Sequence, residues 1–335
     1  MKKKILLVIV FVLCPSVLLH AQGPQPDIRV TLLGTGVPLK DPVAYLASGR
    51  VTAGLLIQAG SERMLFDCGQ GVTTRLLQSG GPDAVDPNIA VDKVFLSHLH
   101  SDHIAELPSL YSYAWPFRGD KPLRVWGPDR SQNQPVGTVA MMRSFRVAFT
   151  SDFRARCCLF TNPEENLPLS GITLKNNVFN LTPGVAYDHN GVTVTAFRVD
   201  HDPVIPAFGF RIDYNGRSVV YSGDTTVSQN LIEHSLKVNV LIHEVYGFPR
   251  DVSPGIFDYH TSPEQAAGVF KSTVPTMAVY THIANPTTDD DLVARTRAAG
   301  YTGPLTVGLD LMQITVMPDG AINIIPPPAG TAGVP

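Results

Sequence analysis

One six-residue segment constrains this chain more than any other feature, because it places three imidazoles and a carboxylate within one turn: His98-Leu99-His100-Ser101-Asp102-His103. An apolar strand expected at Val94–Ser97 precedes it, and a helix expected at Ile104–Tyr113 follows it. Three adjacent imidazoles would repel one another if protonated, whereas a metal ion takes neutral imidazoles and an anionic carboxylate as ligands. The segment therefore predicts a metal site between a strand and a helix.

Three more metal-type ligands occupy similar positions further along the chain. His201 and His282 each follow an expected strand, and Asp224 follows a hairpin that closes at Asn215-Gly216. Strand ends are rigid positions from which side chains can be aimed at one point. Imidazoles and carboxylates are ligands that zinc accepts. We therefore expect the four segments to meet in one metal centre.

Short apolar strands and helical segments alternate along most of the 335 residues. This alternation predicts one α/β domain over residues 22–325, followed by a disordered tail at 326–335. Residues 129–190 interrupt the alternation. They are interpreted as an inserted helical and loop segment that forms a lid beside the site, and an extra packing layer is the equal alternative.

The N-terminus is typical of an export signal. Lys2–Lys4 precede an apolar run at Ile5–Leu13, and a cleavage site is expected after Ala21. The apolar run is too short for a comfortable membrane span, so we expect a periplasmic or secreted protein with no stable membrane anchor. Removing the three lysines changes the net charge from −3 to about −6, which argues against a large nucleic-acid footprint.

The six-residue segment matches the HxHxDH signature of the metallo-β-lactamase superfamily. The chain resembles its ribonuclease Z and zinc arylsulfatase branch, which contains the tRNA 3′-processing endonucleases. Further similar stretches are Leu33-Gly34-Thr35-Gly36, Leu65-Phe66-Asp67-Cys68-Gly69, His201-Asp202-Pro203, Gly209-Phe210-Arg211 and Ser222-Gly223-Asp224-Thr225. The resemblance implies a four-layer αββα sandwich with two mixed β-sheets and the metals at one edge.

The resemblance also implies two zinc ions with separate ligands. One ion would be held by His98, His100 and His201, the other by Asp102, His103 and His282, and Asp224 would bridge the two. A hydroxide held between the ions would be the nucleophile, which agrees with the low pKa of zinc-bound water. The same nitrogen and oxygen ligands would accept manganese or iron in one site.

Four residues are expected to act in the reaction or to support it, and one of them is also a ligand. His260 matches a histidine that contacts the scissile group in this branch, and we assign it protonation of the leaving group; a helix-entry histidine without a role is the alternative. Glu244 would hold and polarise His260, unless it is a solvated loop carboxylate. Asp102 counts as catalytic as well as a ligand. Asp67 is expected to support the ligand loop through a hydrogen bond.

These features predict a metal-dependent hydrolase that acts on ester bonds. The expected export and acidic charge favour a small-molecule sulfate ester or phosphodiester as substrate, with no nucleic acid as partner. A β-lactam or lactone hydrolase is the first alternative, a tRNA 3′-processing endonuclease the second and a non-catalytic zinc-binding protein the third. The pattern leaves a homodimer open.

Overall fold

A computed structural model of the chain describes residues 25–38, 48–80, 91–114, 123–156, 177–248, 255, 259–284 and 288–329. The expected export signal at 1–21 and residues 330–335 of the expected tail lie outside these ranges. Across the described ranges, no helix has both the length and the apolar character needed to span a membrane.

Two mixed sheets form the centre of the molecule. The first has the order β15-β14-β1-β2-β3-β4-β5-β6, and β3 to β6 are parallel. Its strands are β1 (Ile28–Gly34), β2 (Gly54–Ala59), β3 (Glu62–Phe66), β4 (Lys93–Phe95), β5 (Arg124–Gly127), β6 (Val178–Asn180), β14 (Gln313–Val316) and β15 (Ile322–Ile325).

The second sheet has the order β13-β12-β11-β10-β9-β8-β7, and β10 to β13 are parallel. Its strands are β7 (Gly184–His189), β8 (Val192–Arg198), β9 (Phe208–Tyr214), β10 (Arg217–Tyr221), β11 (Val240–Tyr246), β12 (Met277–Ala284) and β13 (Leu305–Val307).

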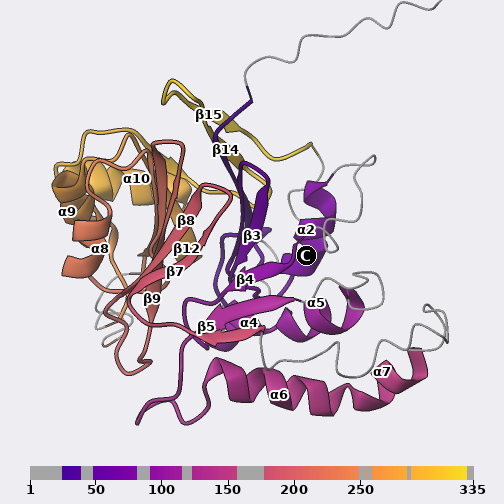
Figure 1. The fold of residues 1–335 in the computed structure, drawn as a ribbon. Helices are drawn as coiled ribbons and strands as arrows, with labels where there is room; N and C mark the ends of the chain where they lie inside the picture. The colour runs from indigo at the N-terminus through magenta and orange to yellow at the C-terminus, as the bar shows by residue number, and fades with distance from the viewer. Residues whose placement is uncertain are drawn as a thin grey trace, which may run out of the picture.

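Helices cover the outer faces of both sheets (Figure 1). The first sheet packs against residues of α2 (Val72–Ser79), α5 (Leu107–Ala114) and α6 (Thr138–Ala148), and the short α4 (Ser101–Ile104) carries part of the HxHxDH segment. The second sheet packs against α8 (Gln229–His234), α9 (Pro263–Thr273) and α10 (Asp289–Ala298). The expected four-layer αββα sandwich is therefore confirmed.

Apolar side chains are buried on both faces of the central strands. In β2, Leu55 and Ile57 belong to the core between the sheets, whereas Leu56 packs in the outer core beneath the helices. Strands with two buried faces read as continuous apolar runs rather than as alternating patterns. The core between the sheets also contains stacked aromatic rings, among them Phe66, Phe95 and Trp126.

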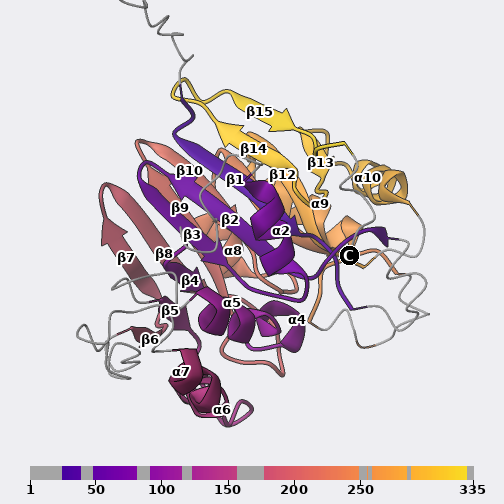
Figure 2. The same cartoon turned by 90° about the vertical axis from the view of Figure 1, so that its right-hand side faces the viewer.

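The expected insertion at 129–190 contributes both helices and edge strands. The helices α6 and α7 (Thr150–Arg156) lie at the β5–β6 end of the sandwich (Figure 2). Strand β6 pairs with β5 at one edge of the first sheet, and β7 pairs with β8 at an edge of the second. Residues 157–176, between α7 and β6, lie outside the described ranges.

Strand direction explains how distant segments meet at one edge. Parallel strands β3 and β4 end just before Asp67 and His98. In the second sheet, β8 and β10 are both antiparallel to β9 and therefore run the same way, so His201 and Asp224 follow strand ends on one side. Because β12 is parallel to β11 and β10, its end brings His282 to the same side.

Candidate metal centre

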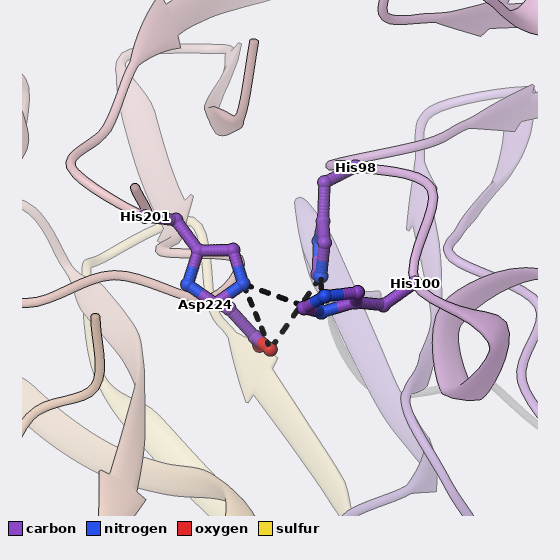
Figure 3. A group of neighbouring side chains, drawn as sticks. All are labelled: His98, His100, His201 and Asp224. Carbon is purple, nitrogen blue, oxygen red and sulfur yellow. Dashed lines mark hydrogen bonds and ion pairs between the residues drawn. The ribbon is translucent and has the colours of Figure 1, made fainter. Parts of the chain in front are cut away.

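All seven side chains predicted as metal ligands converge at this edge. Ligand atoms of one group lie within 4.8 Å of one another, and this group contains His98, His100, His201 and Asp224 (Figure 3). A second group that meets the same limit contains Asp102, His103 and His282. Asp224 lies between the groups, because its Oδ2 is 3.6 Å from His98 Nε2 and 3.2 Å from His103 Nε2.

Local backbone geometry aims His282 at the cluster. The pairing of β11 with β12 shifts register at this point, and His282 has a φ of 48°, in the left-handed region that a non-glycine residue rarely adopts. The next residue, Ile283, donates its backbone N–H to Thr35 O of the first sheet at 2.7 Å. The bulge therefore turns His282 out of the strand while a contact between the sheets holds it.

Burial keeps three ligands of the first group neutral. Burial and then the neighbouring His201 imidazole lower the pKa of His100 to about 4. Burial, reinforced by the His103 imidazole, lowers the pKa of His98 well below its usual value, and burial also lowers the pKa of His201. Neutral imidazoles have a lone pair to offer, so this group is ready to bind a cation at neutral pH.

The two carboxylates of the cluster stay ionised although they are buried. Burial alone would raise the pKa of Asp224, but His103 and His282 hold it well below its usual value. Burial would likewise raise the pKa of Asp102, and His103 and His282 lower it. The edge therefore combines the neutral imidazoles of the first group with anionic carboxylates, which is the ligand chemistry of a divalent metal ion.

Orphaned polar atoms show that the residues fit such an ion. Among the described residues, His103 Nε2 and Asp224 Oδ1 are buried without a hydrogen-bond partner. A buried polar atom without a partner costs free energy of about 1–3 kcal/mol. A divalent cation at this edge would give both atoms a partner, so the residues fit the metal that the sequence predicts.

Asp67 supports the ligand loop, as expected. Its Oδ2 accepts the Nδ1–H of His103 at 2.8 Å, which directs Nε2 of that ring toward Asp224. Ser97 donates its backbone N–H to Asp67 Oδ1 and its hydroxyl to Asp67 Oδ2. Tyr221 donates its hydroxyl to the same oxygen. The sequence analysis missed Ser97 and Tyr221, because a serine and a tyrosine at strand ends have no pattern that distinguishes them.

His260 and Glu244 form a buried pair beside the cluster. His260 Nδ1 donates to Glu244 Oε1 at 2.9 Å. Glu244 is fully buried in β11 rather than in a solvated loop, and it also accepts the backbone N–H of Thr225 at 2.6 Å. Burial alone would lower the pKa of His260, but the Glu244 carboxylate raises it to about 9.

The ring of His260 stacks with two other rings. It stacks on His282 with a centroid distance of 5.5 Å and on Tyr246 at 5.7 Å. The helix entry behind it is well defined, because Ser262 and Gln265 form a capping box and Pro263 starts α9. His260 is thus held by the hydrogen bond to Glu244 and by the two stacked rings, next to the predicted ligands.

Comparison with known proteins decides the family. A family model described as "Beta-lactamase superfamily domain" matches residues 62–283. Ribonuclease Z of Mycobacterium bovis is 32% identical over 303 residues, which cover 87% of this chain and 99% of the relative. The chain belongs to the ribonuclease Z branch of the metallo-β-lactamase superfamily. Ribonuclease Z of Mycobacterium marinum is also 32% identical, over 86% of this chain and 99% of that protein.

Solved structures support the same fold for this ribonuclease Z-related chain. The metallo-β-lactamase fold protein YhfI from Bacillus subtilis has a TM-score of 0.60 at 20% identity, covering 86% of this chain and 99% of that one. The short form of human tRNase Z has a TM-score of 0.58 at 23% identity, covering 86% of this chain and 98% of that one.

These relatives correct the expected substrate. The prediction of an arylsulfatase or small-molecule phosphodiesterase is wrong, and so is the expectation of no nucleic-acid partner, because the relatives are ribonucleases. The metal centre suits either kind of ester, so the expected substrate depended on net charge and export. Net charge is an average over the whole surface and does not report the local field near a site. The expectation of a metal-dependent hydrolase remains.

Proposed function

We propose that this protein is a metal-dependent endoribonuclease that hydrolyses a phosphodiester bond in precursor tRNA. One observation carries the proposal. Every predicted ligand and the His260–Glu244 pair meet at one edge of a chain that matches ribonuclease Z over 99% of the length of that enzyme. The β-lactam, lactone and non-catalytic alternatives have no comparable support.

We assign the ligands to two zinc ions. His98, His100 and His201 would hold one ion, Asp102, His103 and His282 the other, and Asp224 would contribute to both. Zinc in such a site lowers the pKa of water and neutralises charge on a phosphoryl oxygen. The chain itself supplies neutral imidazoles through burial and orients His103 through Asp67.

His260 is proposed as the proton donor. Its Nδ1–H is engaged by Glu244, so the proton available to substrate is on Nε2. When water adds its oxygen to phosphorus, it releases one proton to the solvent, and the leaving oxygen takes a proton from His260 Nε2 as its bond to phosphorus breaks. Glu244 stabilises the charged imidazole before transfer and keeps the ring oriented.

Cleavage of a defined RNA tests the proposal. Zinc-loaded protein should cut a tRNA precursor that carries a 3′ extension at one position, and it should leave a DNA strand of the same sequence intact. Chelation should abolish cutting, and Asp224→Ala should lose both activity and metal. Protein that holds zinc but cuts none of several tRNA precursors would contradict the proposed substrate without contradicting the metal centre.

A further inference from the structure

A hydrogen bond between the sheets joins the two halves of the metal centre. The hydroxyl of Tyr221, at the end of β10 in the second sheet, donates to Asp67 Oδ2 at 2.7 Å. Asp67 follows β3 in the first sheet. Both side chains are buried, with exposed fractions of 1% and 0%. A buried phenol that gives its proton to a carboxylate is a short, well-defined contact in a region of low dielectric.

The acceptor oxygen is shared with a predicted metal ligand. Asp67 Oδ2 also accepts the Nδ1–H of His103 at 2.8 Å and the hydroxyl of Ser97 at 2.7 Å. Ser97 Oγ in turn lies 3.0 Å from His98 Nδ1. The Asp67 carboxylate thus reaches one histidine in each of the two ligand groups. A displacement of this carboxylate would therefore disturb the rings of both His98 and His103.

Ser97 and His103, which also donate to Asp67, follow β4 of the first sheet, whereas Tyr221 comes from the second sheet. Asp224 lies three residues after Tyr221, just beyond the end of β10, and its Oδ2 is 3.2 Å from His103 Nε2. Tyr221 therefore links the carboxylate that holds the His103 ring to the chain segment that carries Asp224. Burial raises the pKa of Tyr221 well above its usual value, so the hydroxyl keeps the proton that it donates.

We infer that Tyr221 is a positioning residue: it holds Asp67, and through Asp67 the His103 ring, at the distance from Asp224 that a metal ion needs. The inference rests on the metal centre of the proposed function but not on its RNA substrate. Residues that orient a ligating histidine typically change metal affinity 10- to 100-fold when they are replaced. Tyr221 acts one step further away, so we expect about a tenfold effect from it.

The test is the zinc affinity of Tyr221→Phe, measured by competition with a chromophoric chelator. This substitution keeps the ring and removes only the donated proton. The more weakly held zinc should bind about tenfold less tightly, and Tyr221→Phe should add less than twofold when it is introduced into Asp67→Asn. Unchanged affinity in Tyr221→Phe, or the same loss in both backgrounds, would overturn the inference.

A matched control separates positioning from stability. Tyr280 is a fully buried tyrosine of the same sheet, whose hydroxyl lies 2.7 Å from Thr296 Oγ1 in α10. Tyr280→Phe should leave zinc affinity unchanged, even if it lowers the melting temperature as much as Tyr221→Phe does. If Asp67→Asn fails to fold, ring-nitrogen NMR shifts of His103 decide, and identical shifts in wild type and Tyr221→Phe would refute the inference. Weakened zinc binding without RNA cleavage would contradict only the proposed function.

Discussion

At the scale of single residues, protonation distinguishes the two ligand groups. Burial lowers the pKa of His98, His100 and His201, so these rings need lose no proton to bind metal. Burial would also lower the pKa of His103, but Asp224, Asp67 and Asp102 raise it well above its usual value. A metal ion bound by the second group would therefore have to displace a proton from His103.

This difference predicts unequal pH dependence. Between pH 7 and pH 6, the affinity of the second ligand group for zinc should fall about tenfold, because one proton competes with the metal. The affinity of the first group should change little. Calorimetric titration in buffers of different ionisation enthalpy checks the number of protons released. Equal proton release at both sites would show that His103 is not held in its charged form.

The charge of Glu244 is the second residue-scale prediction. Because this carboxylate raises the pKa of His260 to about 9, wild-type activity should decline as the pH rises through that value and His260 loses its proton. Glu244→Gln should move the decline to lower pH and reduce activity at pH 8 by about tenfold or more. A pH–rate profile measures both effects. Glu264→Gln, at a half-exposed carboxylate paired with Arg295, is the matched control and should leave the profile unchanged.

At the scale of elements, the loop between β13 and β14 binds Thr35, whose carbonyl accepts the backbone N–H of Ile283 next to His282. Asp310, between β13 and β14, accepts the backbone N–H of Thr35 at 3.0 Å and that of Val51 at 2.8 Å, and it pairs with buried Arg75. Asp310→Ala should lower the free energy of unfolding by about 3–5 kcal/mol, because it removes the carboxylate that pairs with buried Arg75 and accepts two buried backbone N–H groups. Urea denaturation measures this loss. The exposed turn residue Asp319 is the control, and an equal effect of Asp319→Ala would contradict this role of Asp310.

At the scale of the whole molecule, processing of the N-terminus stays a prediction. Lys2–Lys4, the apolar run after them and Ala21 have the order of an export signal. The chain isolated from its native host should therefore begin at Gln22. N-terminal sequencing or intact mass measures this directly. A chain that still carries Lys2–Lys4 would show that the segment is not removed.

The sequence was sufficient for the fold class and for the set of side chains that meet at this edge. His98 to His103 form one local segment, and the other ligands each follow a recognisable strand or hairpin. Such patterns are local, because strand ends and turns are encoded by neighbouring residues. The parallel strands then bring these ends to one edge. The substrate class did not follow in this way, since export and net charge describe the chain and not the site.

Only the tertiary structure decided which side chains support the ligands. Glu244 could equally have been a solvated carboxylate by its sequence, and it proved to be buried against His260. Tyr221 looked like an ordinary strand residue, and its hydroxyl reaches Asp67 across the sandwich. Contacts of this kind join residues that are 16 and 154 positions apart. They depend on how strands and sheets pack against one another, which no local pattern of residues encodes.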